Sequence, residues 1–165
     1  MADHVDRVLE QWHAERPDLD VSPMGVIGRL SRLNALVDAE LRRTFARHGI
    51  DRATFDVLAT LRRSGPPYRL TPTELMRSAM VTSGAITQRL DKMEARGLVE
   101  RTPNETDGRG VRVALTDAGG ELIDRALPEH VETEHRILGA LGADQREELA
   151  GTLRTLLESL GGAGS

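Results

Sequence analysis

The stretch VERTPNETDGRGVRVALTDAG, from Val99 to Gly119, decides the fold of this chain. Two short apolar runs flank a loop of Pro, Asn, Asp and Gly, which is the pattern of a β-hairpin. We expect residues 98–101 to pair with residues 111–115. Arg109 lies near the tip of the loop, where the side chain of Asp107 can form hydrogen bonds that hold the loop in shape.

The segment before the hairpin predicts two helices joined by a turn. Thr71 is the expected N-cap of the first helix, because Pro72 follows at the first helical position and Glu74 completes a capping box. The second helix begins within VTSGAITQRLDKMEARG and ends at Gly97. Two such helices followed by a hairpin make a winged helix-turn-helix, whose second helix enters the major groove of DNA.

Apolar residues at three- and four-residue steps predict further helices on both sides of this motif. The first, second and last helices carry more apolar surface than one small winged domain can bury, so we expect a homodimer. The expected fold is mainly α with a small β-hairpin wing. The expected segments are N-terminal dimerisation helices (1–50), the winged helix-turn-helix (51–116), C-terminal dimerisation helices (117–160) and a flexible tail (161–165).

The net charge of −4 conceals a positive segment. Between Arg62 and Arg112, ten Lys and Arg residues stand against six Asp and Glu, whereas the remainder has 12 against 20. The local sign of the charge determines what a surface attracts. The winged segment therefore favours an anionic partner, for which double-stranded DNA is the candidate.

Several function classes are excluded by what the sequence lacks. It has no cysteine, no run of about 18 apolar residues that would span a membrane, and an acidic amphipathic N-terminus unlike a secretion signal. We therefore expect a cytoplasmic protein with no membrane partner. No zinc-protease motif, phosphate-binding glycine loop or Ser-His-Asp set is present, so we expect neither an enzyme nor a cofactor. His130 and Glu134 lie one helical turn apart, but no third metal ligand is evident, and we predict no metal site.

The second helix and the hairpin supply the candidate DNA contacts. Small residues let the helix backbone approach the bases, and an arginine on a narrow loop can enter a minor groove. If the hairpin were considered alone, a surface hairpin whose arginine has no binding role would be as plausible as a DNA-binding wing. The candidate DNA-binding residues are Thr82, Ser83, Gly84, Thr87, Gln88, Lys92, Arg109 and Arg112.

The run from Thr71 to Gly119 resembles the DNA-binding core of the MarR family of bacterial transcription regulators. LDKMEARGLVER, followed by the D-x-R wing and LTDAG, carries the resemblance, which extends over nearly the whole chain. It implies a homodimer built from interlocking N- and C-terminal helices. It also implies that two recognition helices read a near-palindromic operator. We expect a repressor, but the choice between repressor and activator depends on where the operator lies relative to the promoter.

WHAERPDLDVSPMGVIGRL, which holds the single Trp, resembles the urate-responsive branch of that family, which includes PecS-like regulators. The ligand site of that branch corresponds here to Trp12, Asp56, Arg89 and Arg101. A planar anion such as urate or a related metabolite could stack on the Trp and pair with an arginine. A ligand that rearranges an ion pair between Asp56 and Arg89 would move the recognition helix.

Two alternatives stay open at this point. Trp12 could simply anchor the first helix in the dimer, Asp56 could be a structural ion-pair partner, and the two arginines could contact phosphates alone. The whole protein could instead be an architectural or ligand-independent DNA-binding protein. Such a protein would bind many sequences with steep salt dependence and would ignore metabolites.

Overall fold

A computed structural model of the chain describes residues 2–79, 86–103 and 110–161. The chain divides into two compact units, Met1–Leu41 and Arg42–Ser165. Helix α2 (Ser22–Arg47) contributes to both units. Residues 162–165 of the expected tail lie outside the described residues. No helix in the described ranges is long and apolar enough to cross a bilayer.

The first unit is a helical hairpin made of α1 (His4–Glu15) and the first part of α2. Asp3 caps α1 by accepting hydrogen bonds from the backbone N–H groups of Val5 and Asp6. Arg29 on α2 donates to the carboxylates of Asp3 at 2.9 Å and Asp6 at 2.6 Å. The helices approach closely at Gly28, where a Cβ would stand 3.4 Å from a methyl of Val5. A helix before the winged motif, as the spacing of apolar residues predicted, is thereby confirmed.

The second unit begins with the end of α2 and holds the winged helix-turn-helix. Its helices are α3 (Arg52–Arg63), α4 (Pro72–Ser78), α5 (Ile86–Ala95), α6 (Asp117–Ile137) and α7 (Ala143–Ser159), with a 3-10 turn, η1 (Leu138–Ala140), before α7. Asp51 N-caps α3, and Thr71 with Glu74 forms the expected capping box on α4. Thr116 caps α6, and Gly97 ends the α5 segment with a φ of +67°. The predicted capping box at Thr71 and the predicted end of the second helix at Gly97 are thus confirmed.

Three antiparallel strands form the sheet, in the order β1 (Arg69–Leu70), β3 (Val111–Leu115), β2 (Val99–Pro103). The predicted hairpin is present and extends two residues further along β2 than expected, with Pro103 opposite Val111. Strand β1 was not predicted. Two residues are too few to show the alternation that marks a strand, and β1 exists because β3 offers it a free edge.

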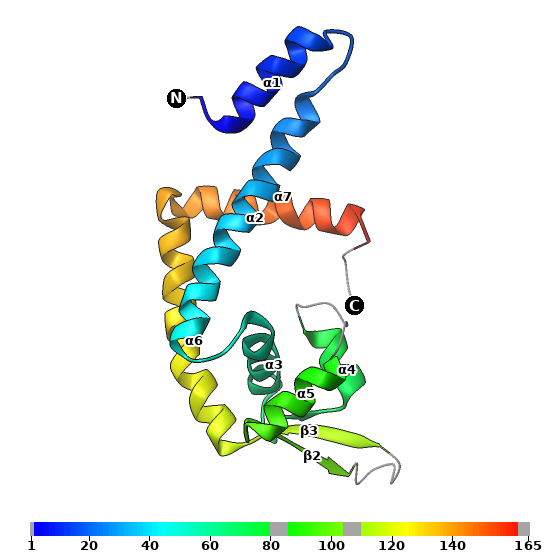
Figure 1. Ribbon diagram of the computed structural model, residues 1–165, viewed down its shortest axis with the longest axis vertical. Helices are drawn as coiled ribbons and strands as arrows, with labels where there is room; N and C mark the ends of the chain where they lie inside the picture. Colours follow the sequence, from blue (N-terminus) through cyan, green and yellow to red (C-terminus); the bar gives the residue numbers. More distant parts are fainter. Residues whose placement is uncertain (1, 80–85, 104–109, 162–165) are drawn as a thin grey trace. The chain divides into compact units, whose positions relative to one another are not determined.

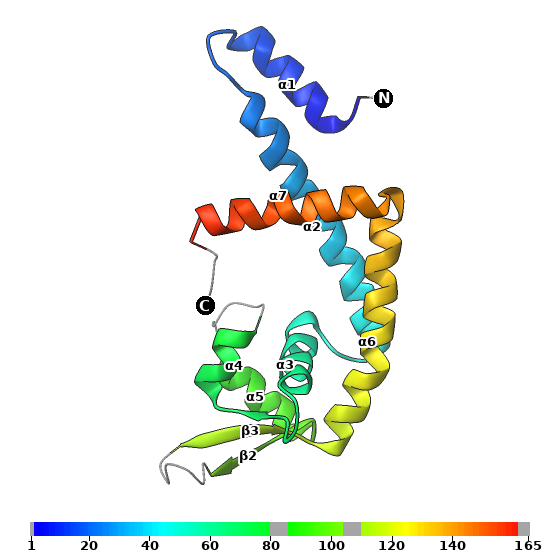
Figure 2. The ribbon, with the colours of Figure 1, turned by 180° about the vertical axis from the view of Figure 1, so that it is seen from behind.

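The core of the second unit lies where α3, α4 and α5 meet the sheet and α6 (Figures 1 and 2). Its fully buried side chains come from every one of these elements: Leu58, Leu61, Leu75, Met93, Val99, Val113 and Ile123. Phe45, near the end of α2, stacks on Phe55 of α3 at 4.5 Å between ring centroids and on His130 of α6 at 5.5 Å. This packing joins the end of α2 to the winged motif through α3 and α6.

Candidate DNA-binding and ligand-binding site

Helix α5 has one buried and one open face. Leu90 and Met93 are buried in the core, whereas Thr87, Gln88 and Lys92 are exposed. The amphipathic pattern thereby leaves these three side chains, together with that of Asp91, on the exposed surface of α5. Among the other predicted DNA contacts, Thr82, Ser83, Gly84 and Arg109 lie outside the described residues, as does Asp107.

Arg112 lies on β3, opposite Thr102 of β2, and is half-buried. Its positive charge interacts with the carboxylate of Glu74, in the first turn of α4. The backbone N–H and hydroxyl of Thr71 lower the pKa of Glu74 through hydrogen bonds, and the charges of Arg112 and Arg77 lower it further. Arg112 is therefore close to a carboxylate within the motif, in addition to its predicted place on the DNA side.

Arg101, predicted as a ligand contact, is held by two acidic residues of α5. Its Nη2 lies 2.7 Å from Oδ1 of Asp91, and its Nη1 lies 2.8 Å from Oε2 of Glu94. Its backbone N–H donates to Oε1 of Glu94 at 3.1 Å, and Nη2 also donates to the carbonyl of Thr87 at 3.4 Å. Sequence reasoning missed these partners. Their spacing of three residues on one helix was a usable signal, since it puts both carboxylates on the same face.

Arg89 is half-buried on α5, and its positive charge interacts with Asp51, the N-cap of α3. Burial by itself would raise the pKa of Asp51. Hydrogen bonds from the side chain and backbone of Thr54, together with the charge of Arg89, outweigh that effect and lower it. An electrostatic link therefore joins the recognition helix to α3, the helix that carries Asp56.

Asp56 is buried, with 8% of its surface exposed, and lines a cavity of about 430 Å³ between α3 and α6. The cavity is also bounded by Phe55, Leu127 and His130. Arg62 stands at its edge, where its Nε donates to Asp124 at 2.8 Å and its Nη1 to the hydroxyl of Tyr68 at 3.1 Å. Of the three predicted ligand residues in this unit, all of them described, Asp56 lines the cavity, whereas Arg89 and Arg101 do not.

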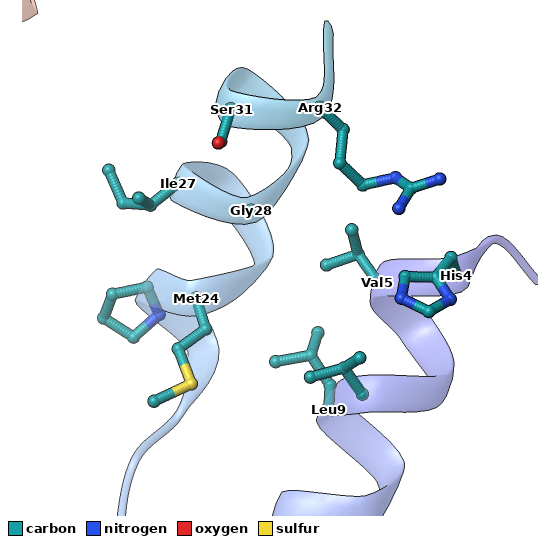
Figure 3. A pocket seen from close by; sticks show the side chains of 10 residues that line it. His4, Val5, Leu9, Met24, Ile27, Gly28, Ser31 and Arg32 are labelled. Carbon is teal, nitrogen blue, oxygen red and sulfur yellow. The ribbon is translucent and has the colours of Figure 1, made fainter. Parts of the chain in front are cut away.

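Trp12 lies on α1 in the first unit, with 42% of its surface exposed. That unit holds a groove of about 560 Å³ between α1 and α2, lined mainly by apolar side chains. Figure 3 shows Arg32 and His4 toward one end of the groove and Met24 and Leu9 toward the other. Trp12 does not line this groove.

His130 and Glu134 contact one another on α6, with Nε2 of His130 3.2 Å from Oε1 of Glu134. Among residues 2–79, 86–103 and 110–161, no group of three or more His, Cys, Asp or Glu side chains is arranged to hold a metal ion. The ring of His130 is stacked on that of Phe45 and lies tilted against that of Phe55. In the described part of the chain, this histidine therefore has a packing role.

Comparison with known proteins gives a consistent result. Residues 48–110 match the sequence model of the MarR family. The HTH-type transcriptional regulator PecS of Dickeya dadantii is 42% identical over 149 residues, which is 90% of both chains. A MarR family regulator from Streptomyces coelicolor, solved in complex with DNA, has a TM-score of 0.77 at 27% identity and covers 86% of this chain and 93% of its own. A mutant MarR from E. coli complexed with operator DNA has a TM-score of 0.71 at 29% identity, with coverages of 88% and 97%.

Proposed function

The chain belongs to the MarR family of transcriptional regulators, and on that premise we propose that it is a homodimeric repressor of the cytoplasm. It binds a near-palindromic operator in double-stranded DNA and is released by a small anionic ligand. The observation that carries the DNA-binding part is the exposed polar face of α5 beside the hairpin of β2 and β3. Two regulators of similar fold were solved on DNA, which supports the same role here.

In the proposed complex, α5 enters the major groove and the wing lies beside it. In this proposal Thr87, Gln88 and Lys92, on the exposed face of α5, contact bases and phosphates, and Thr82, Ser83 and Gly84 are further predicted contacts. Arg112 and the wing-tip Arg109 extend the contact along the duplex. The surplus of Lys and Arg between residues 62 and 112 supplies the electrostatic attraction that this placement needs.

The ligand part of the proposal rests on the set Trp12, Asp56, Arg89 and Arg101. Urate or a related planar anion would stack on the indole and pair with an arginine. Asp56 lines a cavity, and the charge of Arg89 acts on the first turn of the same helix, α3. An anion that draws Arg89 away from α3 would shift α5. The DNA-reading helix would thus exist in two positions, and the ligand would favour one of them.

A footprint over the DNA upstream of the protein's own gene, with and without urate, tests the proposal. We expect protection of a near-palindrome that urate releases. Protection that urate leaves intact would contradict urate as the ligand and keep the regulator. Protection spread over all sequences, with steep salt dependence, would favour a ligand-independent architectural protein.

Replacing Arg109 by Ala is expected to weaken operator binding about ten-fold, because a guanidinium in the minor groove is lost. Fluorescence anisotropy with the protected duplex measures the effect. Arg125→Ala is the matched control, since the side chain of Arg125 on α6 is 62% exposed and carries the same charge. Equal affinities for the Arg109 variant and the wild-type protein would remove the wing tip from the recognition mechanism.

Replacing Trp12 by Phe is expected to raise the ligand concentration needed for release about five-fold, because a smaller ring stacks less well on a planar anion. The affinity for DNA without ligand should stay unchanged, which serves as the internal control. Titration of the protein–DNA complex with urate measures the response. A normal response in the variant would place the ligand site away from α1.

A further inference from the structure

Two acidic side chains stand on α5, the helix that the proposed function places against DNA. Asp91 and Glu94 flank Lys92 and Met93, and both carboxylates face the wing strand β2 rather than the core. Carboxylates near a phosphate backbone weaken binding, because they repel the phosphates. A favourable interaction of these two carboxylates must therefore offset the repulsion.

Asp91 and Glu94 make that favourable interaction with Arg101 on β2. The guanidinium of Arg101 reaches Asp91 with Nη2 at 2.7 Å and Glu94 with Nη1 at 2.8 Å, and its side chain is 26% exposed. Hydrogen bonds between such charged groups are stronger than those between neutral ones. One side chain of the wing thus holds two positions of the recognition helix, spaced by almost one turn.

Glu94 makes a second contact with the same strand. Its Oε1 accepts the backbone N–H of Arg101 at 3.1 Å. Strand β2 is an edge of the sheet, since the order is β1-β3-β2. The N–H of Arg101 therefore has no neighbouring strand to pair with, and Glu94 takes that place. Side chain and backbone of Arg101 are both tied to α5.

We propose that Asp91 and Glu94 are positioning residues for DNA reading, because through Arg101 they hold the wing at a set angle to the recognition helix. The inference rests on the proposed function, since it takes α5 and the wing as the two elements that meet DNA. Two elements that must reach the duplex together bind more tightly when their relative orientation is set beforehand, because less freedom is lost on binding. The short turn through Gly97 leaves that orientation to be decided by contacts between the two elements.

The proposal is tested by the sign of the change in DNA affinity. Asp91→Asn and Glu94→Gln each remove a negative charge, so electrostatics alone would strengthen binding. We expect operator binding to weaken instead, roughly two- to five-fold for each variant, the range of a half-exposed ion pair. For the double variant we expect a loss of about ten-fold. Binding to an unrelated duplex should stay equal or become tighter.

Glu100→Gln is the matched control. Glu100 precedes Arg101 on β2, so its side chain points to the opposite face of the sheet, and it is exposed. Its substitution makes the same charge change in the same strand and leaves the contacts of Arg101 in place. We expect operator affinity equal to that of the wild-type protein or slightly higher.

Anisotropy with the footprinted duplex and with an unrelated one measures both affinities, and a thermal melt accompanies each variant. Operator binding that is unchanged or tighter in Asp91→Asn and Glu94→Gln would overturn the positioning role and leave the proposed function standing. Equal losses on both duplexes together with a lower melting temperature would also overturn it, in favour of a purely structural role. If Glu94→Gln fails to fold, Asp91→Asn still tests the proposal, because the side chain of Asp91 is largely exposed and its substitution leaves the core intact. Failure of the wild-type protein on both duplexes would count against the proposed function itself.

Discussion

Gly119→Ala is expected to lower the free energy of unfolding by about 3 kcal/mol, the upper part of the range for overpacking. Gly119 lies in the first turn of α6, which packs against the turn between α5 and β2. A Cβ at this position would fall on the carbonyl oxygen of Leu98, with Cδ1 of Leu115 at 3.0 Å. The carbonyl cannot move aside easily, because it also accepts the backbone N–H of Thr116 at 3.3 Å.

Gly120→Ala is the matched control for this prediction. A Cβ at Gly120 would meet Cδ2 of Leu115 at 3.8 Å, which is an ordinary contact. The substitution should therefore raise stability by up to about 1 kcal/mol, because alanine favours the helix over glycine. Denaturant unfolding at one protein concentration measures both variants, since dimerisation makes stability depend on concentration. Equal stability changes at the two positions would contradict the close approach of α6 to Leu98.

Leu157→Asp is expected to weaken dimerisation by more than 100-fold, because a carboxylate buried without a partner costs about 3 kcal/mol. Helix α7 has 17 residues and no buried residue within a single chain. Leu157 is 59% exposed there and Leu160 is 77% exposed. An isolated helix of this length is marginal in water, and its stability normally comes from packing an apolar face. A second copy of the chain is the partner that we propose for that face.

Sedimentation of the variant over a range of protein concentrations measures the dissociation of the dimer. Thr155→Asp introduces the same charge on α7 at an exposed polar position and serves as the control. We expect the control to remain dimeric. A Leu157→Asp protein that stays as strongly dimeric as the control would show that α7 packs elsewhere.

The helices and the hairpin of the fold were predictable because the residues at their ends can be recognised from the local sequence. Asp51, Thr71 and Thr116 cap helices through hydrogen bonds to residues three positions ahead, so their signals need no tertiary context. The hairpin was equally visible, since turn residues separate two apolar runs. The short strand β1 was not, because Arg69 and Leu70 become a strand only by pairing with β3.

Part of the candidate site was likewise predictable from the sequence, and part was not. The polar face of α5 followed from helical spacing, and Thr87, Gln88 and Lys92 are exposed as expected. The partners of Arg101 and the cavity beside Asp56 did not follow from it. The proposed pairing of Asp56 with Arg89 and the stacking of a ligand on Trp12 remain predictions for the experiments above.

By itself, the sequence determined the winged motif, the presence of helices on both sides of it, the positive segment and the likeness to a family of regulators. Each of these depends on residues within a few positions of one another or on a sum of charges. Only the tertiary structure decided which carboxylates hold Arg101, why Gly119 must lack a side chain, and that no residue of α7 is fully buried within one chain. Those facts depend on distances between elements, and such distances are set by the packing of the whole core rather than by any local pattern.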